Sequence, residues 1–347
     1  MTLSFFEDMR MYHTLMESIL AGEPLQQGAV EQFFAAVLSG EVEPVQLAAF
    51  LAAVEVKGLR QEELEGACRA VLAHASPFSA PDNVLDVCGT GGDGLNTFNV
   101  STAAAVVCAA CGVVVAKHGN RAATSRCGSF DVLEAAGVFS PEMGPEAEQE
   151  RLARLGICFL FAPHFHPSMR HAAPVRKQLG FPTIFNRIGP LVNPARPAFQ
   201  MIGVARQSDG PLMRACAVAL GAQRVVCVRG EEGLDEVSVC GRTYVWEYTP
   251  QRGERAYTVA PREMGVDEHP LEALAGGDAH ENGELLDALF CGSATSAQQD
   301  FVLANAGMGL YAAGAAADPA EGVARARQAL ASGAVQKLWE KLKEKNI

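Results

Sequence analysis

Glycines and hydroxyl residues are concentrated in one stretch of the sequence, Gly89–Thr102 (GTGGDGLNTFNVST). A short apolar segment before it predicts a strand, and an Ala-rich segment after it predicts a helix. Glycines permit tight turns and leave backbone N–H groups open to a ligand. Ser101 and Thr102 add hydroxyls near a helix N-terminus, where the helix dipole favours anions. The stretch therefore predicts a phosphate-binding loop.

The same stretch matches the G-x-G-x-x-G pattern of dinucleotide-binding folds through Gly89, Gly91 and Gly94. Two features disfavour that interpretation. The next expected strand ends in Lys117 and His118 rather than in an acid that could bind a ribose hydroxyl. Polar residues also follow the glycines where a dinucleotide-binding helix would show its apolar face. A glycine-rich turn without any ligand stays open as a weaker alternative.

A basic segment, Lys117–Ser129 (KHGNRAATSRCGS), begins where the second expected strand ends. On composition alone it could be a solvated surface loop. Its position suggests more, because the carboxyl ends of parallel strands meet at one edge of the sheet, where α/β proteins bind ligands. We therefore expect the basic segment to lie beside the glycine loop.

Two further segments carry groups that could bind metals. Asp235 and Glu236 lie in a short turn, GLDEVS, and adjacent carboxylates suit Mg²⁺ held together with substrate phosphates, although an ordinary acidic turn is the common alternative. His164, His166 and His171 lie close together in the sequence. No nearby acid or cysteine completes a zinc set there, so the histidines are not interpreted as a zinc site.

Composition limits the class of protein. The chain has 347 residues, 49% of them hydrophobic and 20% charged, which suits a globular protein of about two domains. A net charge of −12 argues against a nucleic-acid partner. Ten cysteines without paired spacing predict a reducing, cytoplasmic location, and the C-x-x-C of Cys108 and Cys111 is interpreted as helix packing. Neither a signal peptide nor an apolar run of about 18 residues is found.

The pattern of apolar residues divides the chain in two. Residues 11–20, 30–38, 45–56 and 64–73 have helical spacing and predict a small helical unit. Strand-like segments at 83–88, 113–116, 156–162 and 223–228 then alternate with helices, which predicts a mostly parallel sheet. The tail from about residue 284 is expected to be helical, with one last long helix from Asp318 through Leu338.

In their order and spacing these loops resemble the anthranilate phosphoribosyltransferase family. The motifs that carry the resemblance are GTGGD at 89–93, N-x-S-T at 99–102, K-H-G-N-R at 117–121, GPLxNP at 189–194 and G-L-D-E at 233–236. With the helical N-terminus and the tail from Gly276, the resemblance covers nearly the whole chain. It implies a nucleoside phosphorylase-type α/β fold, in which a small all-helical domain (1–76, joined in space by part of 165–190) precedes a phosphoribosyl-donor-binding α/β domain (77–347). Homodimers would form through the helical side.

The activity implied by the resemblance is the Mg²⁺-dependent transfer of phosphoribosyl from phosphoribosyl pyrophosphate to the amine of anthranilate, a step of tryptophan biosynthesis. Carried over position by position, the implied substrate-binding residues are Gly89, Thr90, Gly92, Asp93, Thr97, Asn99, Ser101, Thr102, Lys117, Asn120, Ser125, Ser129 and Arg176. Asn120 and Arg176 would address anthranilate, with Arg176 on its carboxylate.

The resemblance also implies a metal set and a catalytic set. Ser101, Asp235 and Glu236 would contact Mg²⁺. The candidate catalytic residues are Lys117, His118 and Asp93. Lys117 would offset the charge that develops on pyrophosphate. We interpret His118 as a residue that shapes the path of the acceptor rather than as a general base.

Two positions depart from the family pattern. Phe130 stands where the family has alanine in Gly-Ser-Ala-Asp, and Arg187 stands where residues before GPL are apolar. An extra cation near the acceptor end could alter acceptor preference. Three rivals are kept: pyrimidine nucleoside phosphorolysis, which the K-H-G-N-R and G-L-D-E motifs disfavour, an NAD(P)-dependent oxidoreductase, and a non-catalytic binder of phosphoribosyl ligands.

Overall fold

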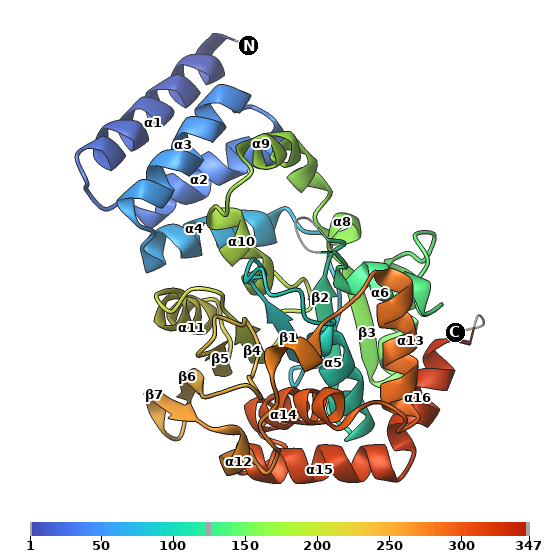
Figure 1. Cartoon of the computed structure of the whole chain (residues 1–347). Coiled ribbons are helices and arrows are strands. Elements are labelled where there is room, and N and C mark those ends of the chain that lie inside the picture. Colours follow the sequence, from blue (N-terminus) through green and yellow to red (C-terminus); the bar gives the residue numbers. More distant parts are fainter. Residues whose placement is uncertain (1, 123–125, 345–347) are drawn as a thin grey trace.

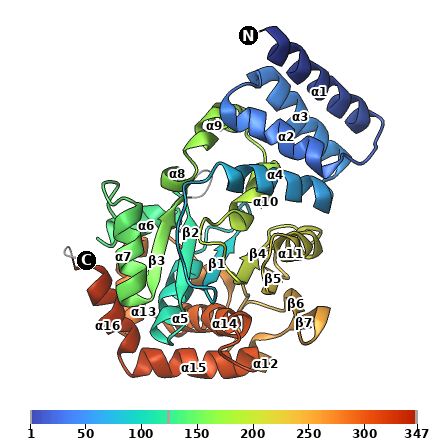
Figure 2. The same ribbon diagram turned by 180° about the vertical axis from the view of Figure 1, so that it is seen from behind.

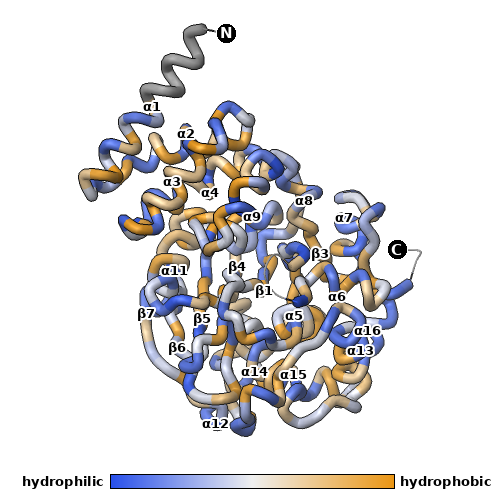
Figure 3. The backbone as a smooth tube through the Cα atoms, turned by 45° about the horizontal axis from the view of Figure 1, so that its top comes forward, coloured by the Kyte–Doolittle hydropathy of each residue, from blue (hydrophilic) through white to orange (hydrophobic). Residues whose placement is uncertain are grey.

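The computed structural model describes residues 2–122 and 126–344, with side chains described from residue 11 onward. A small helical domain sits above one end of a larger α/β domain (Figures 1 and 2). The helical domain contains α1 (Thr2–Leu20), α2 (Gln27–Ser39), α3 (Pro44–Lys57) and α4 (Gln61–Ala73), which confirms the four predicted helices. Hydrophobic and hydrophilic residues alternate along these helices (Figure 3). Their inward faces pack around Phe33, Phe34 and Phe50, all buried.

Local sequence explains where these helices begin and end. Gly40 has φ 77° and closes α2 in the left-handed conformation that glycine adopts without strain. Pro44 opens α3, where its missing N–H costs no helical hydrogen bond.

In the described part of the α/β domain, a seven-stranded sheet has the order β3-β2-β1-β4-β5-β6-β7. The strands are β1 (Leu85–Gly89), β2 (Val115–Gly119), β3 (Ile157–Phe161), β4 (Phe199–Gly203), β5 (Arg224–Gly230), β6 (Thr243–Thr249) and β7 (Gly253–Val259). β3, β2, β1, β4 and β5 run parallel. β6 pairs antiparallel with β5 on one side and with β7 on the other. The predicted fold class, a helical domain plus a mostly parallel sheet, is confirmed.

The remaining elements cover the sheet or connect its strands. They are α5 (Val100–Ala110), α6 (Ser129–Ala135), α7 (Pro145–Leu155), α8 (Ala162–Phe165), α9 (Ala173–Leu179), α10 (Ile184–Ile188), α11 (Asp209–Ala219), α12 (Pro261–Met264), α13 (Ala279–Phe290), α14 (Ser296–Ala312), α15 (Pro319–Ala331) and α16 (Ala334–Leu342), with 3-10 turns at Pro167–His171, Gly189–Leu191 and Leu271–Leu274. None of the described helices is long and apolar enough to cross a membrane.

The two faces of the sheet belong to different cores. Val87 of β1 packs with α5 and α14, whereas the next residue, Cys88, packs in a cluster that also contains Phe34 of α2. This division follows from the alternation of side chains along a strand. One face of the sheet is therefore continuous with the core of the helical domain, which holds the two domains against each other.

The chain between β3 and β4 returns to the helical domain. The 3-10 turn Pro167–His171 contacts α2, α9 contacts α3, and α10 contacts both α3 and α4. This segment lies between the helical domain and the sheet edge that carries the glycine loop. The exact division of the chain at residues 76 and 77 stays a prediction.

The tail differs from the sequence-based expectation in one respect. The single last helix expected from Asp318 through Leu338 is wrong, because α15 ends at Ala331 and α16 begins at Ala334. Gly333 between them has φ 73°, a left-handed conformation that interrupts the helix. The apolar periodicity continues across the break, since both helices pack on the same core, and that continuity masked the turn.

Candidate active site

The glycine loop leaves the sheet at the point where the strand order reverses. The chain proceeds from β1 through β2 to β3 on one side, and β4 and β5 lie on the other side of β1. Gly89, the last residue of β1, pairs with Gly203 of β4. In open α/β sheets this crevice beyond the carboxyl ends of the strands is where ligands bind. The parallel pairing of β1 and β2 also places the basic segment at the same edge, as the sequence predicted.

The acidic turn closes onto the glycine loop. The backbone N–H of Gly91 donates to Oδ2 of Asp235 at 2.7 Å. A Cβ at Gly89 would lie 2.6 Å from that same oxygen, and a Cβ at Gly203 would lie 1.6 Å from the backbone oxygen of Asp235. Only glycine at both positions allows this close approach. On the other side, Cβ atoms at Gly91 and Gly92 would meet nothing within 4 Å, so the loop borders open space that a ligand could occupy.

The carboxyl groups at this junction repel one another. Burial, and then the neighbouring charge of Asp93, raise the pKa of Asp235 to about 7. Burial, and then the charge of Asp235, raise the pKa of Glu236 well above its usual value. Asn305 of α14 holds the turn in place through both backbone groups of Val237, at 2.9 and 3.0 Å. A cation beside these groups would favour their ionised forms.

The donor set suits Mg²⁺ better than a soft metal. Carboxylate oxygens are the ligands that Mg²⁺ prefers, and Mg²⁺ commonly takes only one or two of them from a protein. Among the described residues, no group of three or more His, Cys, Asp or Glu side chains is placed to hold a metal ion. The protein therefore offers an incomplete set, which substrate phosphates and water would complete.

Lys117 brings a positive charge into the same junction. Its ammonium is buried and donates to the backbone oxygen of Val87 at 2.6 Å and to Oγ of Ser101 at 3.2 Å. Two of its three donors are thus engaged, and one stays available. Ser101 lies in the first turn of α5, so the ammonium and the helix N-terminus present positive charge to one place. The charge of Lys117 also favours ionisation of Glu236 by lowering its pKa.

A buried acid and amide, which the sequence analysis did not single out, align the two strands. Asp86 accepts the backbone N–H of His118 at 3.2 Å and an amide hydrogen bond from Asn193 at 2.8 Å. The amide of Asn193 also donates to the backbone oxygen of Ala116 at 2.7 Å. Burial raises the pKa of Asp86 to about 6. Asn193 is the asparagine of GPLxNP, and that motif was the available signal.

The basic segment is tied to the glycine loop by amide side chains. Asn99 donates to the backbone oxygen of Cys127 at 3.1 Å and accepts from Asn282 of α13 at 3.1 Å. Oγ of Ser129 donates to the backbone oxygen of Asn120 at 3.2 Å. The structure thus brings Asn99, Asn120 and Ser129 together at one end of the sheet. Ser125 lies outside the described residues.

Three hydroxyl residues of the glycine loop differ in how they are engaged. Thr90 donates to the backbone oxygen of Gly91 at 3.2 Å and accepts from the N–H of Ala205 at 3.2 Å. Thr97 forms an isolated antiparallel bridge with Ala275. Thr102 is fully buried, and its hydroxyl has no hydrogen-bond partner among the described residues. Of the two hydroxyl residues at the start of α5, Ser101 is therefore the partly exposed one, and its Oγ accepts from Lys117.

Two buried imidazoles line the boundary with the helical side. The rings of His118 and His166 are 5.2 Å apart and nearly perpendicular. Burial lowers the pKa of His118 to about 3 and that of His166 to about 4. Nδ1 of His118 lies 3.3 Å from the backbone oxygen of Gly189, which favours the neutral tautomer with its proton on Nδ1. His118 is thus neutral at pH 7.

Because His118 and His166 are buried in their neutral form, we expect the folded protein to lose stability in acid. Their pKa values are lower in the folded state than the ordinary value of about 6.5, so the unfolded chain binds protons first as the pH falls. The stabilisation is complete above about pH 6.5 and is lost progressively toward pH 4. Denaturant unfolding between pH 5 and 8 should show that wild type loses more stability than a His118→Asn/His166→Asn variant. His13→Asn, at an exposed position, is the control and should follow wild type. Parallel curves for all three proteins would contradict the assignment.

Arg176 has no carboxylate within ion-pair distance among the described residues. It lies on α9, and its guanidinium carbon is 4.9 Å from the centre of the Phe185 ring. Burial lowers its pKa, so an anion beside it would relieve an unfavourable position. Phe185 belongs to α10, which therefore supports the side chain of Arg176.

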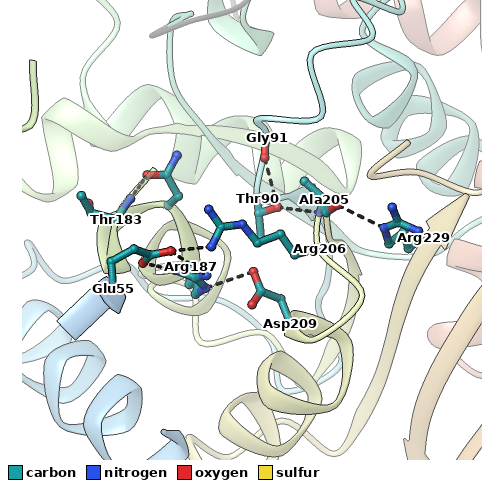
Figure 4. A network of polar contacts seen from close by, with 10 residues as sticks. Glu55, Thr90, Gly91, Thr183, Arg187, Ala205, Arg206, Asp209 and Arg229 are labelled. Atoms are coloured by element: carbon teal, nitrogen blue, oxygen red, sulfur yellow. Dashed lines mark hydrogen bonds and ion pairs between the residues drawn. The ribbon is translucent and has the colours of Figure 1, made fainter. Parts of the chain in front are cut away.

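Both departures from the family pattern turn out to be buried in the interior. Phe130 packs against Phe139 and Phe161, with ring centres 4.7 and 4.8 Å away. Arg187 is 6% exposed and pairs with Glu55 and Asp209, each at 3.0 Å (Figure 4). Two carboxylates therefore neutralise the Arg187 guanidinium, and an effect of this residue on acceptor preference stays a prediction.

Together, the helical domain, the mostly parallel sheet and the glycine loop at its switch point define a glycosyltransferase. The model of the glycosyl transferase family helical bundle domain matches residues 13–75, and the model of the family's a/b domain matches residues 81–336.

The similarity to individual proteins is more specific. An anthranilate phosphoribosyltransferase from Chloroherpeton thalassium is 43% identical over 333 residues, which is 94% of this chain and 96% of that protein. The crystal structure of anthranilate phosphoribosyltransferase from Thermus thermophilus has a TM-score of 0.89 at 43% identity, covering 95% of this chain and 98% of that one. The Saccharomyces cerevisiae enzyme in complex with PRPP and Mg has a TM-score of 0.86 at 28% identity, covering 95% and 96%. The chain belongs to the anthranilate phosphoribosyltransferase family.

Proposed function

We propose that the protein transfers the phosphoribosyl group of phosphoribosyl pyrophosphate to the amine of anthranilate, giving phosphoribosyl anthranilate and pyrophosphate in tryptophan biosynthesis. The observation that carries this proposal is the junction of the glycine loop, Lys117 and the Asp235–Glu236 turn at the switch point of the sheet. This junction offers backbone N–H groups, a buried cation and carboxylates for a metal. That combination suits a pyrophosphate ester better than a nicotinamide or a neutral ligand.

The donor would bind along the glycine loop and the start of α5. Its contacts would come from the residues Gly89, Thr90, Gly92, Asp93, Thr97, Asn99, Ser101, Thr102, Lys117 and Ser129. Ser101, Asp235 and Glu236 would hold Mg²⁺. When bound, Mg²⁺ supplies positive charge that stabilises negative charge on the leaving pyrophosphate.

The reaction forms a C–N bond at the anomeric carbon of the ribose as the bond from that carbon to the pyrophosphate oxygen breaks. The transition state has cationic character at the sugar and growing negative charge on the leaving group. The ammonium of Lys117 stabilises that negative charge at a fixed position in a partly water-excluded site. Asp93 lies within the glycine loop and would be the second candidate catalytic residue in contact with the donor.

The acceptor would lie between the basic segment and α9. Asn120 and Arg176 would address anthranilate, with the Arg176 guanidinium on its carboxylate. No strong base is needed, because the attacking nitrogen becomes acidic once it has bonded to carbon and can lose its proton to water. The neutral, buried His118 would then shape the acceptor path.

This assignment predicts a limited effect of His118→Ala. Turnover should fall by less than about 10³-fold, since no proton transfer through the imidazole is required. Steady-state rates at saturating substrates would test it. A larger loss with an intact fold, reversed by added imidazole, would instead indicate acid–base catalysis.

One assay tests the function as a whole. The protein is incubated with anthranilate, phosphoribosyl pyrophosphate and Mg²⁺, and the loss of anthranilate fluorescence is followed. Aniline, which lacks the carboxylate, is the matched acceptor control and should react far more slowly. No loss of fluorescence, together with phosphorolysis of a pyrimidine nucleoside or reduction of a nicotinamide, would refute the proposal. Binding of the donor without turnover would indicate a non-catalytic binder.

We also propose a homodimer formed through the helical domain, in the cytoplasm. Three large apolar side chains of the described helical domain are strongly exposed: Leu20 at 79%, Val45 at 73% and Val56 at 90%. Burial of such residues against a second copy would remove apolar surface from water. Sedimentation of wild type and of Val45→Asp/Val56→Asp would test the dimer, since the variant should sediment as a monomer. The ten free thiols suit a reducing compartment.

A further inference from the structure

An ion-pair cluster with a buried centre and one exposed member, Arg206, joins the helical domain to both sides of the site. It comprises Glu55 of α3, Arg187 of α10, Arg206 after β4 and Asp209 of α11, and we call it the Arg187 cluster (Figure 4). Nε of Arg187 donates to Asp209 at 3.0 Å, and its two terminal nitrogens donate to the two oxygens of Glu55 at 3.0 and 3.4 Å. Arg206 forms a close ion pair with the same carboxylate of Glu55.

The geometry of this cluster is demanding. Moving an arginine out of water is costly, and only well-placed carboxylates offset that cost. Arg187 meets this condition with a fork-like pair to Glu55 and a third hydrogen bond to Asp209. Burial raises the pKa of the Glu55 carboxyl, but the hydrogen bonds from Arg187 and Arg206 outweigh this effect and keep the pKa below its usual value. The Glu55 carboxylate is therefore ionised at neutral pH, and a shift of α3, α10 or α11 would break one of its contacts or one of those of Arg187.

The helix that carries Arg187 also supports the acceptor side of the site. Phe185, two residues earlier on α10, lies under the guanidinium of Arg176, whose central carbon is 4.9 Å from the centre of the ring. The backbone oxygen of Gly189, directly after α10, lies 3.3 Å from Nδ1 of His118. Any rotation or displacement of α10 would move both contacts together.

The cluster reaches the donor loop by a separate path. Ala205, the neighbour of Arg206, donates its backbone N–H to Oγ1 of Thr90 at 3.2 Å, and Arg229 donates to the backbone oxygen of Ala205 at 3.1 Å (Figure 4). The donor loop is also held by Asp235, which does not belong to the cluster. Loss of the cluster should therefore disturb the acceptor side more than the donor side.

We propose that Arg187 is a positioning residue for the acceptor: its ion pairs with Glu55 and Asp209 fix α10, and α10 in turn places Arg176 and the Gly189–Leu191 turn against the bound donor. This inference rests on the proposed function. Arg187 does not itself touch the substrate, because its guanidinium is occupied by the two carboxylates.

The test is the Arg187→Leu variant, which restores an apolar residue at this position. The KM for anthranilate should rise about 10-fold or more, while the KM for phosphoribosyl pyrophosphate and kcat each change by less than about 3-fold. Titration of anthranilate fluorescence should show an equal loss of affinity for the acceptor. Arg187→Lys keeps the charge but cannot form the forked pair, so its KM should lie in between.

A matched control separates positioning from loss of stability. Arg151 is also buried and paired with an acid, Glu148 at 2.7 Å, but it lies on α7 beside β3. Arg151→Leu should lower the melting temperature as Arg187→Leu does and leave the KM for anthranilate unchanged. If Arg187→Leu does not fold, Glu55→Gln carries the test, because it weakens the same pairs while keeping the shape of the side chain.

The outcomes are distinct. An unchanged acceptor KM in folded Arg187→Leu, an equal rise in both KM values, or the same rise in Arg151→Leu would each overturn the inference while wild-type turnover stands. Absence of turnover in wild type would instead refute the proposed function.

Discussion

Replacing Lys117 with methionine should lower kcat/KM for phosphoribosyl pyrophosphate by about 10²–10³-fold, the loss typical of removing one group that stabilises charge in a transition state. The ammonium lies at the start of α5, 3.2 Å from Oγ of Ser101, where the leaving pyrophosphate would gain charge. Methionine has a similar length and keeps the apolar stem packed. Steady-state kinetics with both substrates varied would measure the effect.

A structural contribution of Lys117 must be separated from the electrostatic one. The variant leaves the backbone oxygen of Val87 without the ammonium that donates to it at 2.6 Å, which costs roughly 1–3 kcal/mol of stability. Melting curves would measure this cost. Lys337→Met makes the same chemical change at an exposed position of α16 and should leave activity at the wild-type level. A folded Lys117→Met protein with less than a 10-fold loss would rule out the proposed role.

Converting the acidic turn to amides, Asp235→Asn with Glu236→Gln, should remove the dependence on Mg²⁺ and lower activity at saturating Mg²⁺ by about 10³-fold. Asparagine keeps an oxygen that can accept from the N–H of Gly91, so the loop contact is preserved. Glu231→Gln, an exposed acid shortly before the turn, is the control and should retain wild-type activity. A variant whose activity still rises with Mg²⁺ would show that the ion binds elsewhere.

The Asp235→Asn/Glu236→Gln variant should also differ from wild type in its melting temperature. In wild type the folded-state pKa of Asp235, about 7, exceeds the unfolded value of about 3.9, so its contribution is complete below pH 3.9 and is lost as the pH rises through 7. Without Mg²⁺ at pH 8, the amide variant should therefore melt at a higher temperature than wild type. Mg²⁺ should stabilise wild type and leave the variant unchanged, because only the ion that binds the folded state raises its stability. Equal shifts in both proteins would contradict the assignment.

Disrupting the Arg187 cluster should change a different kinetic parameter from the variants above. Lys117 and the acidic turn would act on the donor and its leaving group, whereas Arg187 would act on the acceptor through α10. Variants of the first kind should lower kcat/KM for the donor, and Arg187→Leu should change the acceptor KM. These different kinetic effects allow the three roles to be told apart within one set of assays.

Much of the architecture followed from the sequence alone. The four N-terminal helices, the strands β1, β2, β3 and β5 and the helix after the glycine loop were predicted, because each has a clear local pattern of apolar residues. β4, β6 and β7 were not predicted. β4 follows a turn-rich segment, and the β6–β7 hairpin mixes polar and apolar residues at the sheet edge, so neither stands out by composition.

The sequence also indicated which loops carry the chemistry. The glycines and hydroxyls of Gly89–Thr102 indicate a phosphate site. The adjacent carboxylates of Asp235 and Glu236 suit Mg²⁺, but an ordinary acidic turn has the same sequence, and only the order of the motifs along the chain favours the metal. The sequence could not show that Gly91 and Asp235, 144 positions apart, are joined by a hydrogen bond. Nor could it show that Thr102 is buried while Ser101 is partly exposed.

Arg187 shows most clearly what only the tertiary structure decided. In the sequence, the arginine before GPL indicates only an extra cation near the acceptor end. In the fold, α3 and α11 bring Glu55 and Asp209 to it from positions 132 and 22 residues away. A charge acts through its surroundings, and the sequence specifies the charge but not the partners that neutralise it. The sequence of the glycine loop indicates the class of ligand. The packing of the folded chain decides which cations have carboxylate partners and which do not.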